Sequence, residues 1–224
     1  GQAREDKRVG ITGGPGVGTT TLVRSILESC DAKEMKCVLA APTGRAAKRL
    51  AETTDRTAKT LHRLVEFDPA TGKFQKDAEH PLSGDLFVLD ETSMVDVVLG
   101  YQFLRAVPAE ACVILVGDVD QLPSVGAGSV LADLIAANVV PVVRLTEIFR
   151  QASHSQIVTA AYAVNQGLMP KLSAPEALTD FYFVEADEPE VIQDLLVRLV
   201  KERIPTRFGF DPKADIQVLT PMNR

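Results

Sequence analysis

Residues 9–21, VGITGGPGVGTTT, place an apolar run directly before a glycine-rich turn, and a helical pattern, TLVRSILESC, begins at Thr21. A phosphate-binding loop is expected where a strand enters a helix through such a turn. The glycines let backbone N–H groups converge on phosphate oxygens, and the helix N-terminus adds a favourable dipole. The segment therefore predicts an α/β fold with a nucleotide phosphate site at its first turn.

The loop departs from the pattern G-x-x-x-x-G-K-[ST] at one position, where Thr19 replaces the lysine expected after Gly18. Lysine reaches the β- and γ-phosphates as a point charge, whereas threonine offers a short neutral hydroxyl. We expect the backbone cradle to bind ATP while hydrolysis is impaired. A glycine-rich turn without nucleotide is the alternative for this loop taken alone.

The residues assigned to nucleotide binding are Gly13, Gly14, Pro15, Gly16, Val17, Gly18, Thr19, Thr20, Thr21 and Asp90. Of these, Thr20 and Asp90 carry the oxygen atoms expected to hold Mg²⁺, through a hydroxyl and a carboxylate. The cofactors predicted from the sequence are thus ATP and Mg²⁺.

Composition is that of a folded globular protein, with 46% apolar and 24% charged residues among 224. No stretch approaches the roughly 18 apolar residues of a membrane span, and the start, GQAREDKRVG, is polar. We expect a cytoplasmic protein with no membrane partner and with free thiols at Cys30, Cys37 and Cys112. The net charge of −6 disfavours a protein that coats nucleic acid with its whole surface, but leaves room for a local basic patch.

Short apolar runs alternate with helical patterns, which indicates a doubly wound parallel sheet with helices on both faces. The expected strands are VGIT, CVLAAP, LFVLDE, CVILVGD and VVRL. Ligands of such sheets bind at the carboxyl ends of the strands, and the polar residues Thr43, Asp90 and Asp118 follow those ends.

Two segments interrupt this alternation. The turn signal DPATG within Leu64–Gly84 predicts an inserted β-hairpin. After Gly167, prolines and small polar residues precede a helix around VIQDLLVRLV and an expected strand, DIQVLT. We therefore expect a first domain at residues 1–167 and, at 168–224, a linker with the beginning of a second α/β domain, so that the chain is a fragment of a longer protein.

An acidic pair and a glutamine follow two of the expected strands. In LFVLDETSMVD, Asp90 can hold the Mg²⁺ shell while Glu91 orients and deprotonates the attacking water. In VILVGDVDQLPSVG, the carboxamide of Gln121 can contact both the γ-phosphate and that water. Taken alone, each segment could instead be a solvated strand end or a polar turn. Their order after the phosphate loop favours the catalytic interpretation.

RLTEIFRQ contains Arg150, a candidate arginine finger supplied in cis. A lone arginine after a strand is more often an ordinary surface residue, and the other motifs support the catalytic assignment.

The most basic stretch is Ala41–Leu64, which contains only two acidic residues, Glu52 and Asp55. Its cationic residues are Arg45, Lys48, Arg49, Arg56, Lys59 and Arg63. With Thr43, Thr60 and His62 as hydrogen-bonding groups, the stretch suits a sugar-phosphate backbone bound without sequence readout, although a solvated helix face explains the charge equally well. Phe67 and Phe74 could stack bases or pack the hairpin.

Taken in order, GGPGVGTTT, APTGRAAKRL, TAKTLHRL, VLDETSMVD, VGDVDQLPSVGAGSVL, LTEIFRQ and QVLTPMNR resemble the motifs of RecD-like helicases of superfamily 1B. The resemblance implies a RecA-like motor that moves 5′ to 3′ on single-stranded DNA, works in repair or recombination, and can have partner subunits in a recombination complex. It implies a strand-separating pin near Phe67–Lys76. It assigns DNA binding to Pro42, Thr43, Gly44, Arg45, Thr60, His62 and Arg63.

Two other classes of protein compete with a helicase core. A non-catalytic module could keep the fold and bind DNA or a partner subunit while its phosphate loop degenerates. A small-molecule kinase of the same fold would show an arginine-rich lid after the strand that carries Asp90, and the sequence has none.

Overall fold

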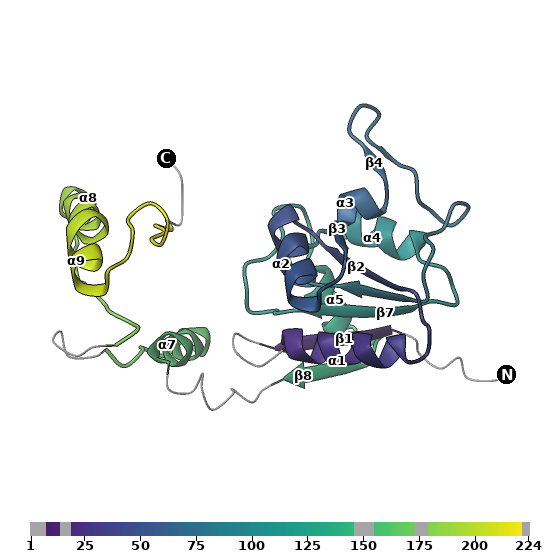
Figure 1. Ribbon diagram of the computed structural model, residues 1–224, viewed down its shortest axis with the longest axis horizontal. Coiled ribbons are helices and arrows are strands. Elements are labelled where there is room, and N and C mark those ends of the chain that lie inside the picture. The colour runs from purple at the N-terminus through teal and green to yellow at the C-terminus, as the bar shows by residue number, and fades with distance from the viewer. Residues whose placement is uncertain (1–7, 14–18, 146–154, 173–178, 221–224) are drawn as a thin grey trace. The chain divides into compact units, whose positions relative to one another are not determined.

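The computed structural model describes residues 8–13, 19–145, 155–172 and 179–220. The chain forms two compact units, residues 1–170 and residues 171–224. Both are shown in Figure 1.

The first unit is built on a six-stranded parallel sheet in the order β3-β2-β6-β7-β1-β8. Its strands are β1 (Arg8–Gly13), β2 (Cys37–Ala41), β3 (Ala58–Thr60), β6 (Leu86–Leu89), β7 (Cys112–Gly117) and β8 (Val142–Leu145). Strand β1 lies inside the sheet, because Gly10 is paired with Leu115 of β7 and with Val142 of β8. The five strands expected from apolar runs are confirmed.

Helices cover both faces of this sheet, as expected for a doubly wound fold. Within its described residues, the first unit has the helices α1 (Thr19–Asp31), α2 (Gly44–Thr54), α3 (Leu61–Leu64), α4 (Val97–Ala106), α5 (Val130–Ala136) and α7 (Gln156–Asn165). One core cluster joins α1 and α2 to alternate strand residues such as Leu39 and Val88. The other joins α3, α4 and α5 to the intervening residues, such as Phe87 and Leu89. The strands are therefore apolar on both faces, which explains their continuous hydrophobic runs.

The inserted hairpin is present, and it projects away from the sheet (Figure 1). Its strands are β4 (Phe67–Asp68) and β5 (Lys73–Phe74), paired antiparallel. Asp68 closes the turn, because its carboxylate accepts hydrogen bonds from Ala70 N at 2.9 Å and Thr71 Oγ1 at 2.8 Å. Gly72 takes the left-handed conformation, with φ of 67°, that such a turn favours in glycine.

The described residues of the second unit contain helices and no strand. They form α8 (Pro189–Arg198), the π-helical turn η2 (Leu199–Arg203) and α9 (Ile204–Phe208). The helix around VIQDLLVRLV is confirmed, whereas the strand expected in Asp215–Thr220 is wrong. A strand needs a hydrogen-bonding neighbour, and the described residues of this unit provide none. The start of a second RecA-like domain stays a prediction.

None of the helices in the described ranges is long and apolar enough to cross a membrane.

Candidate functional site

The parallel sheet brings the carboxyl ends of β1, β7 and β6 to one edge, with β7 between the other two. Asp118, directly after β7, therefore lies between the strand that leads to the phosphate loop and Asp90, directly after β6. Phosphate-loop residues 14–18 lie outside the described residues. Helix α1 begins at Thr19, so the strand-to-helix context expected of the loop is present on both sides of it.

Asp90 and Glu91 form a rigid turn at this edge. Asp90 N donates to Ala40 O at 2.9 Å, which ties the pair to the end of β2. The Asp90 carboxylate accepts the Glu91 backbone N–H at 2.9 Å. Glu91 has φ of 51° and ψ of 40°, a left-handed conformation that is uncommon outside glycine and is found at functional sites. The 3₁₀ turn η1 (Thr92–Met94) follows, held by a 2.9 Å bond from Thr92 Oγ1 to Leu89 O.

The pKa values of both carboxyl groups are raised, chiefly by burial. Burial raises the pKa of Asp90, against a smaller opposing effect of the Glu91 N–H and of the Arg49 guanidinium. Burial also raises the pKa of Glu91, and the neighbouring Asp90 and Asp118 add to the rise while Arg49 opposes it. A partly desolvated carboxylate with a raised pKa is a stronger general base than an exposed one. Arg49, a member of the basic stretch, therefore also acts on the acidic pair, a link that the sequence alone does not predict.

The Gln121 side chain donates to Asp118, whose place after β7 is predicted from the sequence while this role is not. The Asp118 side chain is only 5% exposed. It accepts Asp120 N at 3.0 Å through Oδ1 and Gln121 Nε2 at 3.3 Å through Oδ2. The spacing D-x-x-Q was the available signal, because a carboxylate can cap a turn and meet a side chain three residues later. The structure thus brings Asp90, Glu91, Asp118 and Gln121 to one sheet edge.

The carboxylate of Asp90 provides oxygen ligands for Mg²⁺ at this edge of the sheet. No cluster of three or more histidine, cysteine, aspartate or glutamate side chains suited to a metal occurs among the described residues. Mg²⁺ is usually held by one or two carboxylates together with substrate phosphates, so the desolvated Asp90 carboxylate fits the ion. The Thr20 side chain and Arg150 lie outside the described residues.

Two helix starts follow the neighbouring strands β2 and β3 and contain the residues assigned to DNA. Thr43 caps α2, accepting Ala46 N at 3.2 Å, and Thr60 caps α3, accepting Arg63 N at 3.3 Å. Each hydroxyl keeps its own proton free to donate, so capping leaves room for a phosphate contact. Thr43, Arg45, His62 and Arg63 are exposed, and Gly44 opens α2 beside Pro42.

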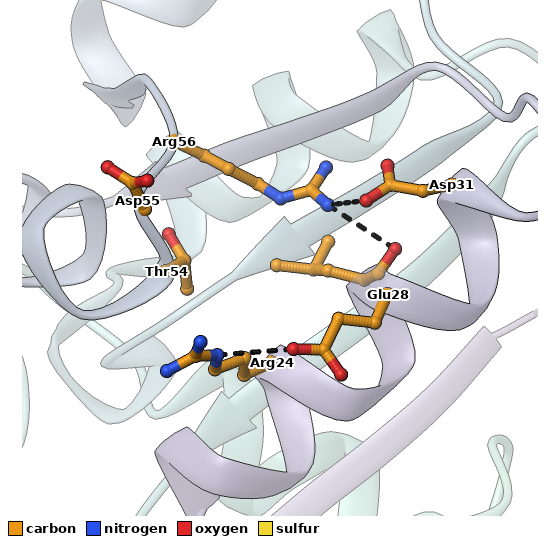
Figure 2. A pocket seen from close by; sticks show the side chains of 7 residues that line it. Arg24, Glu28, Asp31, Thr54, Asp55 and Arg56 are labelled. Atoms are coloured by element: carbon orange, nitrogen blue, oxygen red, sulfur yellow. Dashed lines mark hydrogen bonds and ion pairs between the residues drawn. The ribbon is translucent and has the colours of Figure 1, made fainter.

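Arg56 does not join the other cations of the basic stretch. Helix α2 starts at the carboxyl ends of the strands and runs back along the sheet. Arg56, which follows its C-cap, therefore lies near the amino ends of the strands. There Arg56 Nη2 pairs with the Asp31 carboxylate of α1 and donates to Leu27 O at 3.4 Å (Figure 2). The basic stretch is therefore divided between two edges, and Arg56 fastens α1 to α2.

A cleft of about 470 Å³ opens beside this ion pair. It is lined by Arg24, Leu27, Glu28, Asp31, Thr54, Asp55 and Arg56. Figure 2 shows Arg24 turned to Glu28, with Nε 3.2 Å from the carboxylate, and Arg56 turned to Asp31. The cleft lies between the ends of α1 and α2, away from the acidic pair, and is separate from the candidate site.

The aromatic residues of the hairpin pack on each other. The Phe67 and Phe74 rings are 4.9 Å apart, and the His62 ring meets Phe67 edge-on at 5.5 Å. Phe74 also packs against the core cluster formed by α3 and α4. These contacts favour hairpin packing over base stacking for the two phenylalanines.

A parallel sheet with an acidic pair and a held glutamine at its carboxyl edge defines a nucleotide-binding domain of the phosphate-loop class. The sequence matches the family model described as "AAA domain" over residues 1–127, more than half of the chain. The chain belongs to this AAA domain family.

Within that class its similarity is to RecD-type helicases, as the motifs predicted. It is 41% identical over 160 residues to the "ATP-dependent RecD2 DNA helicase" of Deinococcus radiodurans, covering 71% of this chain and 22% of that protein. It is 43% identical over 148 residues to the "RecBCD enzyme subunit RecD" of Mycobacterium tuberculosis, covering 56% of this chain and 26% of the relative. The chain thus spans about a quarter of the length of these curated relatives.

Among solved structures, an arterivirus nonstructural protein 10 helicase in complex with DNA matches at a TM-score of 0.48 and 13% identity, over 81% of this chain and 45% of that chain. A likeness at this level does not bear on function.

Proposed function

We propose that this chain is the core of an ATP-dependent DNA helicase of the RecD type, which moves 5′ to 3′ on single-stranded DNA during repair or recombination. The proposal is supported chiefly by the desolvated pair Asp90 and Glu91, which shares a sheet edge with the Asp118–Gln121 hydrogen bond. Similarity to RecD proteins supports the choice of DNA as the track.

In this proposal each residue at the edge has one task. Asp90 holds Mg²⁺, which when bound neutralises phosphate charge. Glu91 accepts the proton of the attacking water, a task that its raised pKa assists. Gln121, oriented by Asp118, contacts the γ-phosphate and that water, and Arg150 stabilises charge in the transition state.

The proposed DNA track crosses the starts of α2 and α3. Backbone N–H groups at the start of α2, beside Pro42, Thr43 and Gly44, suit phosphate oxygens, and Arg45 adds a positive charge. Thr60, His62 and Arg63 extend the same surface from the adjacent strand β3. Partner subunits of a recombination complex belong to the proposal as well, since one relative is a RecBCD subunit.

The helicase core and its main alternative, a non-catalytic module, interpret Thr19 differently. In a helicase core, threonine at this position removes the charge that binds the β- and γ-phosphates and impairs hydrolysis. In the alternative, the chain is a non-catalytic module that binds DNA or a partner subunit and has a degenerate phosphate loop. The joint presence of Asp90, Glu91, Asp118 and Gln121 favours the enzyme, because loss of nucleotide chemistry would remove the need for all four.

The test is a titration of a fluorescent ATP analogue with Mg²⁺ into the chain and into Thr19→Lys, with and without single-stranded DNA. Phosphate release is followed in the same samples. We expect the lysine variant to bind at least tenfold more tightly. Thr19→Lys combined with Glu91→Gln is the control, which should bind nucleotide but release no phosphate above background. Absence of binding by every variant at high micromolar concentration would support the non-catalytic module.

A further inference from the structure

The hairpin at residues 67–76 is too short to hold its own position. Each strand contributes two residues, and only two cross-strand pairs join them. Two-stranded ribbons are marginally stable in water even when they are longer. The direction in which the hairpin projects must therefore be set by contacts with the rest of the first unit.

The base of the hairpin provides one set of such contacts. Gln75 N donates to Glu66 O at 3.2 Å, and Lys76 N donates to Val65 O at 3.3 Å. Phe74 anchors the same base in the core. These two backbone bonds join the legs to each other, and they do not attach the return leg to a helix.

Helix α4 provides a second set, directed at the return leg. Gln102 Nε2 donates to Lys76 O at 2.6 Å, between groups 26 residues apart in sequence. One turn further on, Arg105 Nη2 lies 3.8 Å from the Asp77 carboxylate. Ala106 O then accepts Leu82 N at 2.8 Å. Gln102 and Arg105 are three residues apart, so their side chains lie on one face of the helix, and Ala106 O adds a backbone contact at its C-terminal end.

The other end of α4 is fixed to the candidate site. Asp96 caps the helix, accepting Leu99 N at 2.8 Å, and follows Glu91 through the single turn η1. Val97 N donates to Ala127 O at 2.9 Å, which attaches the loop after Gln121 to the same helix start. A helix of ten residues spans about 15 Å, so α4 connects the acidic edge to the hairpin as one rigid element.

We propose that Gln102 is a positioning residue, which fixes the return leg of the hairpin to α4 and so holds the hairpin at a constant position relative to Glu91 and Gln121. Among the hydrogen bonds of the described residues, Gln102 Nε2 is the side-chain donor to Lys76 O. That a hairpin held in this way helps to separate DNA strands rests on the proposed helicase function. The link between Gln102 and Lys76 is independent of that function.

The link is tested by amide hydrogen exchange on the whole chain without ligands. Gln102→Met keeps the length of the side chain and removes the donor, Gln102→Lys restores a donor, and Tyr101→Ala is the matched control on the neighbouring exposed position. We expect exchange of the Gln75 and Lys76 amides to become about five- to tenfold faster in Gln102→Met only, as loss of one hydrogen bond implies. Amides of β6 and β7 should not change.

The consequence is tested by DNA binding of the same proteins. We expect the chain to prefer a forked duplex with a 5′ tail over the tail alone, Gln102→Met to lose that preference while still binding the tail, and Gln102→Lys to regain it. Unchanged exchange in Gln102→Met would overturn the link. Faster exchange with an unchanged or absent fork preference would overturn its role at the junction. If no protein bound DNA, the proposed function would fail and exchange alone would decide the link.

Discussion

Replacement of Gly117 by alanine is expected to destabilise the first unit through one identifiable clash. Gly117 ends β7 against the turn that carries Glu91. A Cβ atom there would lie 2.8 Å from Leu131 Cδ2 and 3.1 Å from the backbone nitrogens of both Thr92 and Ser93. The leucine methyl can move. The two backbone atoms cannot, because Thr92 is fully buried and bonded through its hydroxyl to the end of β6.

Two opposing contributions set the magnitude. Forcing an extra carbon into a packed site costs about 1–3 kcal/mol. Alanine also reduces the conformational entropy of the unfolded chain, which stabilises the folded state by about 0.4–1 kcal/mol. The net loss therefore lies between about 0 and 2.6 kcal/mol. Its central value of about 1.3 kcal/mol lowers the melting temperature of a unit of this size by roughly 3–5 °C.

The assay is urea unfolding followed by far-UV circular dichroism, because the chain has no tryptophan to report by fluorescence. The midpoint should fall while the denaturant slope stays the same. Gly44→Ala is the matched control, since a Cβ at Gly44 meets nothing within 4 Å. It should be neutral or slightly stabilising. Equal midpoints for the two variants would refute the reasoning, because both would then be ordinary glycine replacements.

Three further predictions rest on single contacts. Arg56→Ala should lower the unfolding free energy by roughly 0.5–1.5 kcal/mol, a modest effect because its partner Asp31 is 55% exposed. Ser93→Ala should raise it by up to about 1 kcal/mol, because the buried Ser93 hydroxyl has no hydrogen-bond partner among the described residues. The His80 N–H, followed by NMR, should shift in acid as Asp77 protonates, with a midpoint below the ordinary aspartate pKa because that N–H stabilises the carboxylate. This anchoring is present at neutral pH and is lost as the pH falls through the lowered pKa.

Each of these has a control in the same chain. Arg24→Ala removes a more exposed ion pair, whose two side chains are 65% and 64% exposed, and should have little effect on stability. Ser124→Ala removes a hydroxyl that is bonded to Gly126 O at 2.7 Å, and should lower stability where Ser93→Ala raises it. Asp77→Asn should abolish the acid shift of the neighbouring amide. The opposite order for the two serines would contradict the account of Ser93.

The parts of the fold that could be predicted are those whose cause is local in sequence. Five strands were predictable from continuous apolar runs, because strands buried on both faces must be apolar. Strand β3, with the sequence AKT, gave no such signal and exists only because it pairs with the edge of β2. The absent strand at Asp215–Thr220 is the converse case, a suitable sequence without a neighbour among the described residues. Pairing is a non-local property that a single sequence does not display.

The candidate site divides in the same way. Asp90 and Glu91 were predictable because they directly follow an apolar run. The hold of Asp118 on Gln121 depends on side-chain rotamers at a turn, and the proximity of Arg49 to the acidic pair depends on how α2 lies over β2 and β6. Arg56 was grouped with its neighbours by charge, whereas helix geometry carries it to the opposite edge. Composition identifies which side chains exist, and the direction of each helix decides which of them meet.

Thr19 favours a non-catalytic module, whereas the carboxyl groups of Asp90, Glu91 and Asp118 favour a nucleotide-binding enzyme. The surroundings of Asp118 help to decide between the two. A lysine at this position of a phosphate loop acts on the phosphates of the ligand, so a threonine there bears on nucleotide chemistry and not on the folded core. Asp118 is buried, and its carboxylate accepts hydrogen bonds from Asp120 N and Gln121 Nε2. The bond to Asp120 N stabilises the turn whatever the function of the chain. The bond that orients Gln121 near Glu91 is different, because it has a task at a nucleotide-binding edge and none in a docking module.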